Sequence, residues 1–140
     1  MQGKTHLVYG VAAGLAVSGD WRGAALGGLA ALLPDWVQIN VPWLGETVKG
    51  FTGHRGISHW LWTPLALAYL ARLYAVPDSA ILTFCAGYLS HLLLDLLADG
   101  IPFLWPLKRI TLAHIKTGGA LDNLIGGAGL LAIVGLWLSR

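Results

Sequence analysis

Residues 79–98 read SAILTFCAGYLSHLLLDLLA, and this long apolar stretch decides the fold. Its length matches the roughly 20 residues that an α-helix needs to cross a bilayer. Asp78 can cap such a helix at its start, and Gly100 follows its end. The stretch lacks the polar–apolar alternation of a half-buried strand. It therefore predicts a transmembrane helix, with His91 and Asp95 one turn apart near its end.

The composition of the whole chain supports a membrane environment. The 140 residues suit a single domain, 1–140, and are 56% hydrophobic but only 11% charged. Soluble domains are about 25% charged. The net charge is only +2, and no Lys/Arg cluster of the kind that binds phosphate backbones is visible. We therefore expect membrane lipid as a partner and do not expect nucleic acid.

Four further apolar segments surround this helix in the sequence, at 6–18, 22–33, 58–76 and 119–138. The last two are long enough to span a bilayer. The first two are shorter, rich in glycine and joined by the tight turn Gly19-Asp20-Trp21. The predicted fold is an all-α integral-membrane bundle of about five helices, with three full spans and a short glycine-rich hairpin. A hairpin buried in a soluble protein is the alternative.

Helices that alternate up and down place both loops 34–57 and 99–118 on one side. Six Lys or Arg residues fall on this side and three on the other, which favours the cytoplasmic side of an inner membrane for these loops. The segment 36–53 mixes tryptophans with aliphatic residues. We expect it to lie in the membrane interface or to pack over the helix ends.

Histidines and aspartates gather at this same side, where apolar runs begin or end. Such residues are costly in apolar segments and tend to mark function. The candidate metal ligands are His6, Asp35, His54, His59, His91 and Asp95. Imidazole with carboxylate suits zinc, with manganese or iron as alternatives, in a site for one or two ions. Any single histidine can instead be structural, and we expect His114, in a polar loop, to be solvated.

A family resemblance follows from motifs that run in order along most of the chain. They are Thr5-His6, Leu32-Leu33-Pro34-Asp35, His54-Arg55-Gly56-Ile57-Ser58-His59, Ser90-His91-Leu92-Leu93-Leu94-Asp95 and Leu104-Trp105-Pro106-Leu107. These motifs resemble the YdjM-like family of small membrane-bound metal-dependent hydrolases of bacteria and archaea. The resemblance implies that the His and Asp residues of the motifs are metal ligands.

The chain departs from the family pattern at three places. Val37 stands where many relatives have a second acid, and Trp60 stands where many have Ser. Ala98-Asp99-Gly100 replaces a Thr and a longer turn. The missing acid affects a two-metal ligand set, for which Asp99, one turn beyond Asp95, can compensate.

The expected chemistry is hydrolysis at the membrane surface. Zinc lowers the pKa of a bound water to about 7, and Asp35 or Asp95 can act as general base. Arg55 can bind a phosphate, which suggests a phosphoester or an amphiphilic phosphorylated substrate. Ser58 and Ser90 can support the neighbouring histidines. Two alternatives stay open: a non-catalytic membrane protein with a structural metal and a protein-binding surface, and a metal or proton transporter.

Overall fold

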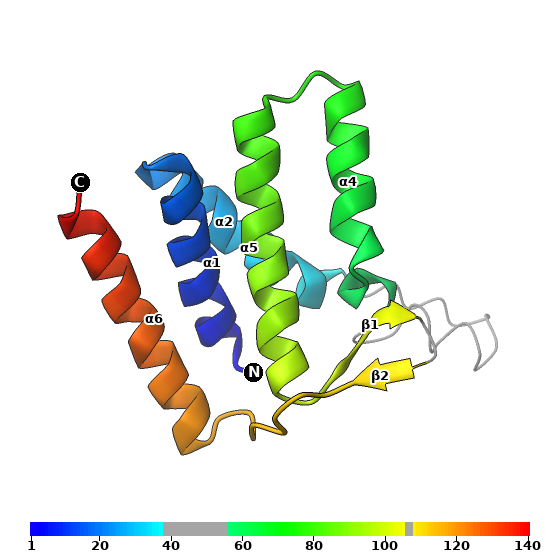
Figure 1. Ribbon diagram of the computed structural model, residues 1–140, viewed down its shortest axis with the longest axis vertical. Coiled ribbons are helices and arrows are strands. Elements are labelled where there is room, and N and C mark those ends of the chain that lie inside the picture. Colours follow the sequence, from blue (N-terminus) through cyan, green and yellow to red (C-terminus); the bar gives the residue numbers. More distant parts are fainter. Residues whose placement is uncertain (38–55, 106–107) are drawn as a thin grey trace.

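The computed structural model describes residues 1–37, 56–105 and 108–140, and within these ranges the chain is mainly helical (Figure 1). The described α-helices are α1 Gly3–Ser18, α2 Trp21–Trp36, α4 Trp62–Leu73, α5 Asp78–Leu97 and α6 Ala120–Leu138. The short η1 Ile57–His59 is a 3₁₀-helix, and β1 Ile101–Trp105 pairs with β2 Lys108–Ile110. The predicted all-α bundle of about five helices is confirmed.

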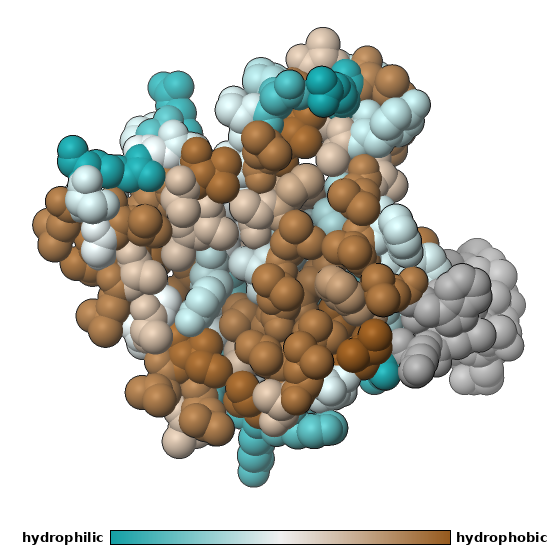
Figure 2. All heavy atoms as spheres, viewed as in Figure 1, coloured by the Kyte–Doolittle hydropathy of each residue, from teal (hydrophilic) through white to brown (hydrophobic). Residues whose placement is uncertain are grey.

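Two of the described helices are long and apolar enough to cross a membrane. They are α5 with 20 residues and α6 with 19, each with a mean hydropathy of 1.7. In α6, only 11% of the 18-residue apolar stretch is buried inside the protein, whereas the corresponding share in α5 is 44%. Figure 2 shows apolar side chains over much of the visible face. An apolar helix this exposed fits a bilayer, because lipid rather than protein then covers its side chains.

The third expected span is shorter in the structure. Segment 58–76 forms η1 and then the 12-residue helix α4. Twelve residues rise about 18 Å, which is less than the roughly 30 Å hydrocarbon core. The helix starts late because Pro64 suits only a first turn, where its missing amide hydrogen has no helical partner. Ala75, with φ at 57°, adopts a left-handed conformation directly after the helix ends.

The expected glycine-rich hairpin forms from α1 and α2, and it packs against α5. Gly19 has a φ of 86° and ends α1, and Asp20 then caps α2 by accepting a hydrogen bond from the Gly23 amide at 2.8 Å. A Cβ atom on Gly14 would lie 3.0 Å from the Gly27 Cα. Glycine therefore lets the two backbones touch. Each helix has 16 residues, more than the segments of about 12 expected from the sequence.

The small antiparallel hairpin of β1 and β2 was not expected from the sequence. Ile101, which is fully buried, pairs with Ile110. The amide of Leu61 donates to the Phe103 carbonyl at 2.9 Å, which ties β1 to the turn between η1 and α4. The hairpin extends from the end of α5, and it holds η1 close to that helix (Figure 1).

Candidate metal centre

Four side chains from three separate elements converge beside the second half of α5. They are Asp35 of α2, His59 of η1, and His91 and Asp95 of α5. One ligand atom from each lies within 4.8 Å of all the others. Two His nitrogens and two carboxylate oxygens are a donor set suited to zinc or a similar divalent ion.

Five of the six distances between these atoms are close to the edges of a tetrahedron around one ion, and the sixth, between the two aspartates, is at most 4.8 Å. His59 Nε2 lies 3.1 Å from His91 Nε2, 3.6 Å from Asp35 Oδ1 and 3.5 Å from Asp95 Oδ2. His91 Nε2 lies 3.7 Å from the same oxygen of each aspartate. Ligands about 2.0–2.1 Å from a tetrahedral zinc stand about 3.3–3.4 Å apart. The four donors therefore fit a single ion of this size.

Local sequence explains how each element presents its ligand. His91 and Asp95 share a face of α5 because they are one turn apart. The second apolar segment of the sequence stops at residue 33, but α2 continues through Pro34 to Trp36. This last turn carries Asp35 toward α5. The hydroxyl of Tyr88 donates to the Ser58 carbonyl at 2.5 Å, which fixes η1 against α5.

Both histidines have partners on the ring nitrogen that faces away from the cluster. The Nδ1 of His91 lies 2.6 Å from the carbonyl oxygen of Ala31, which can only accept. Nδ1 must therefore carry the hydrogen, which leaves the Nε2 lone pair of a neutral His91 for a metal. The Nδ1 of His59 lies 3.0 Å from the Ser58 hydroxyl, as the sequence suggested. Ser90 differs from its expected role, because its hydroxyl donates to the Gly87 carbonyl at 2.7 Å.

The contacts within the cluster favour the charged forms of Asp35 on α2 and of His59 on η1. Burial lowers the pKa of His59, but the hydrogen bonds to Asp35 and Asp95 outweigh it and raise the pKa above the usual value. Burial raises the pKa of Asp35, but the hydrogen bond from His59 and the nearby imidazoles bring it below the usual value. A proton and a metal ion therefore compete for His59.

His6 lies directly against the cluster but outside the group of four. Its ring stacks on His91 with centroids 3.8 Å apart, and its Nε2 is 3.1 Å from Asp95 Oδ1. Its Nε2 therefore pairs with Asp95, whereas its buried Nδ1 has no hydrogen-bond partner in the part of the chain that the structure describes. The terminal amino group of Met1 contacts the same Asp95 oxygen at 2.8 Å. Asp95 therefore faces His59 and His91 with Oδ2, and it faces His6 and the terminal amino group with Oδ1.

Other candidate residues lie elsewhere. His54 and Arg55 fall outside the described residues. His114 is exposed, and Asp99 is exposed and accepts from the Thr117 hydroxyl at 3.1 Å, so neither joins the group of four. Asp122 is fully buried and accepts hydrogen bonds from Thr5 Oγ1 and from the amides of Gln2 and Gly118. It thus joins α6 to the start of α1.

Sequence reasoning missed two groups that support the cluster. Tyr88 lies one turn before His91 on the same face of α5, and this spacing was a signal for its role. No feature of the sequence indicates the role of the Ala31 carbonyl, because every residue carries the same backbone acceptor. A buried polar contact of this kind becomes visible only when the helices are packed.

The fold and this cluster define a small helical membrane protein with a candidate His/Asp metal centre. The family model described as YdjM inner membrane protein matches residues 1–139, and the chain belongs to this family. It is 28% identical to the inner membrane protein YdjM of Escherichia coli (strain K12) over 153 aligned residues, which cover 89% of this chain and 77% of that protein. The YdjM protein of Shigella flexneri gives the same values. No solved structure matches the chain.

Proposed function

We propose that this protein is a membrane-bound metal-dependent hydrolase whose metal centre is the Asp35, His59, His91 and Asp95 cluster. One observation carries the proposal. The side chains of His59, His91 and Asp95 are at most 1% exposed, whereas Asp35 is 29% exposed. The cluster thus has three buried ligands and is accessible at Asp35, which leaves an open position for water and substrate, as in catalytic metal sites.

The residues divide into two roles under this proposal. His59, His91 and Asp95 hold the ion, and their contacts with Ser58 and the Ala31 carbonyl orient the rings. A bound divalent ion would lower the pKa of a coordinated water to about 7. Asp35, at the open side, is placed to accept a proton from that water.

We further propose a phosphoester or lipid-linked substrate. Arg55, close to His59 in the sequence, is the proposed anion-binding residue. Zinc is the proposed ion, with manganese or iron as alternatives, in a site for one or two ions. The excess of basic residues on the same side supports a cytoplasmic position for the site.

A structural metal site is the second candidate function, and the ligand count favours it. Four protein ligands complete the tetrahedral shell of a structural zinc. In that case the ion would fasten α2, η1 and α5 together, and the protein would not turn over a substrate.

The two candidates are separated by measuring metal content and phosphoester turnover on protein purified in detergent. We expect His91→Ala to lose most of the bound zinc and His114→Ala, an exposed histidine outside the group of four, to keep it. We expect Asp35→Asn to lose turnover of phosphatidic acid or p-nitrophenyl phosphate. Zinc content unchanged in His91→Ala would refute the metal centre. Wild-type protein that binds zinc but hydrolyses neither compound with zinc or manganese would refute the hydrolase and favour the structural site.

A further inference from the structure

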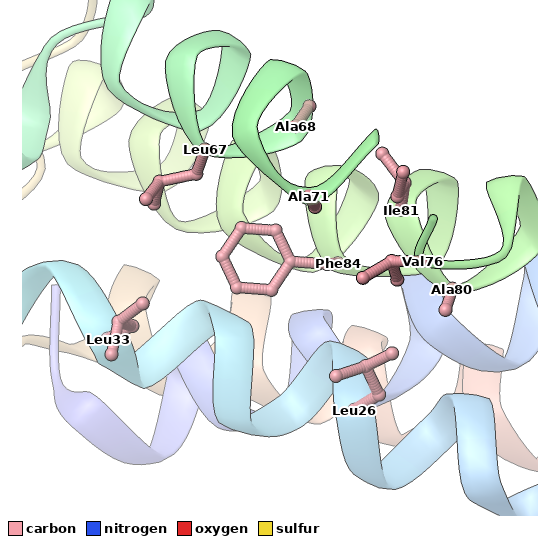
Figure 3. A pocket seen from close by; sticks show the side chains of 9 residues that line it. All are labelled: Leu26, Leu33, Leu67, Ala68, Ala71, Val76, Ala80, Ile81 and Phe84. Carbon is pink, nitrogen blue, oxygen red and sulfur yellow. The ribbon is translucent and has the colours of Figure 1, made fainter. Parts of the chain in front are cut away.

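Helix α5 has different surroundings along its two halves. Beside its first half, the ring of Phe84 projects into an apolar groove between α4 and α2, with Leu33 on the α2 side (Figure 3). The lining of this groove includes neither His91 nor Asp95, and these two ligands are met instead by His6 of α1. The two ligands of α5 thus have a fully buried polar neighbour that is not itself a member of the group of four.

His6 contacts both ligands of α5 at the same time. Its ring lies nearly parallel to the ring of His91, with an interplanar angle of 22° and centroids 3.8 Å apart. Its Nε2 lies 3.1 Å from Asp95 Oδ1. An ionised carboxylate can only accept, so Nε2 carries the hydrogen in this pair, whether His6 is neutral or protonated. A ring nitrogen that carries a hydrogen has no lone pair for a metal, so this arrangement excludes Nε2 of His6 as a ligand.

The two oxygens of Asp95 have different neighbours. Besides His6, Oδ1 contacts the Met1 amino group at 2.8 Å. Oδ2 lies 3.5 Å from His59 Nε2 and 3.7 Å from His91 Nε2. The last torsion of an aspartate side chain has a broad energy minimum, so a carboxylate turns easily unless hydrogen bonds hold it. Donors on Oδ1 hold this carboxylate with Oδ2 toward the cluster, which makes Asp95 a ligand through one oxygen.

The other ring nitrogen of His6 argues against a role in packing alone. Nδ1 is buried and has no hydrogen-bond partner among the residues that the structure describes. A buried polar atom without a partner costs stability, and an apolar ring at the same place would avoid that cost. A histidine at this position is therefore explained by the contact of its Nε2 with Asp95 and not by its size.

The residue before His6 holds the start of α1 against a different helix. The Thr5 hydroxyl donates to Asp122 Oδ1 of α6 at 2.8 Å, whereas His6 faces α5. Consecutive residues of an α-helix point in directions about 100° apart, so the two members of the pair reach different neighbours. Both are at most 1% exposed. The Thr5-His6 pair thus sets the rotation of α1 that brings His6 Nε2 to Asp95.

We infer that His6 is a positioning residue of the metal centre, which donates from Nε2 to Asp95 Oδ1 and so holds Oδ2 of the same carboxylate toward the ion. This role differs from the ligand role that the family resemblance implies for His6. The inference rests on the metal centre of the proposed function, but it does not require that the protein hydrolyses a substrate. Hydrogen bonds that orient a metal ligand change metal affinity about 10–100-fold when they are removed.

Two substitutions separate the donor of His6 from its ring. His6→Gln keeps a side-chain N–H and loses the ring, whereas His6→Phe keeps a ring and loses the donor. We expect His6→Phe to weaken zinc binding about tenfold or more, and His6→Gln to stay within about threefold of wild type, in chelator competition on the full chain in detergent. A role in packing predicts the reverse order, because a phenyl ring replaces the imidazole ring more closely than a Gln side chain does. His6→Met, which matches Gln in length but has no donor, should behave like His6→Phe and keeps the test valid if the phenyl variant does not fold.

The absorption spectrum of bound cobalt is a second readout, because its visible bands depend on which atoms coordinate the ion. We expect His6→Gln to leave these bands where they are in the wild type. Shifted bands would show that His6 itself coordinates the ion and would overturn the inference. Equal losses of zinc affinity in His6→Gln and His6→Phe, or wild-type affinity in both His6→Phe and His6→Met, would also overturn it.

The His91→Ala variant distinguishes this failure from that of the metal centre. If His91→Ala loses zinc while His6→Phe and His6→Met keep it, the metal centre stands and only the role of His6 is wrong. If His91→Ala keeps its zinc, the metal centre and the role of His6 fail together. If the expected order of zinc affinities is found while wild type hydrolyses nothing, the role of His6 stands and the hydrolase proposal fails.

Discussion

Helices α5 and α2 approach closely near the metal centre, where Gly87 meets Gly27. A Cβ atom on Gly87 would lie 2.7 Å from the Gly27 Cα and 2.8 Å from its carbonyl carbon. Carbon atoms pack best at about 3.5–4.0 Å. Gly87→Ala must therefore push α2 and α5 apart by roughly 1 Å. Overpacking of this kind costs about 1–3 kcal/mol.

The displacement would act on the metal centre because α2 carries Asp35 and the Ala31 carbonyl. The 2.6 Å contact between His91 and Ala31, and the 3.7 Å separation of His91 and Asp35, both cross this interface. We expect Gly87→Ala to weaken zinc binding about tenfold, since 1.4 kcal/mol corresponds to a factor of ten. We also expect its unfolding temperature in detergent to fall.

The measurements are zinc affinity by chelator competition and thermal unfolding by tryptophan fluorescence. Gly127→Ala in α6 is the matched control, because no atom beyond the helix itself lies within 4 Å of its added Cβ. Alanine also favours a helix over glycine by about 1 kcal/mol, so the control should be at least as stable as wild type. Gly87→Ala with wild-type zinc affinity and unfolding temperature would show that the contact does not position the cluster.

Three further predictions concern the surroundings of the cluster. Ser58→Ala removes the hydroxyl 3.0 Å from His59 Nδ1 and should weaken zinc binding about 10–100-fold, measured by chelator competition; an unchanged affinity would exclude a supporting role. Asp122→Ala leaves three hydrogen-bond donors without their buried acceptor and should destabilise the protein by about 1–3 kcal/mol in thermal unfolding, whereas an unchanged midpoint would contradict the link between α1 and α6. Zinc affinity should rise with pH through and above the ordinary His range near 6.5. The reason is that Asp35 and Asp95 raise the pKa of His59, whose proton must leave before zinc binds. A pH-independent zinc affinity between pH 5.5 and 8 would refute this.

The sequence predicted the convergence of the cluster because helix direction alternates along a bundle. Asp35, His59 and His91 stand where apolar runs begin or end, so alternation alone brings them to one side. The sequence could not separate His6 from the four clustered residues. Its place beside the second oxygen of Asp95 depends on how α1 packs against α5.

Gly87 is a second example of a feature that the sequence indicates in part and that helix packing completes. In the sequence, Gly87 lies one turn before His91 and leaves space beside His91 and Asp95. In the structure the space is filled by the backbone of α2 at Gly27. A missing side chain in a sequence indicates that something comes close, but the identity of that neighbour depends on the packing of helices distant in the chain.

The sequence by itself determined the helical class, the apolar nature of the chain and the end of the bundle at which its ligand-type residues gather. These follow from composition and from segment length, which are local properties. Only the tertiary structure decided that α4 is a 12-residue helix, that β1 and β2 pair, and that the Ala31 carbonyl fixes the tautomer of His91. The physical reason is that each of these depends on backbone groups meeting across the fold, and backbone hydrogen bonds leave no residue-specific trace in a sequence.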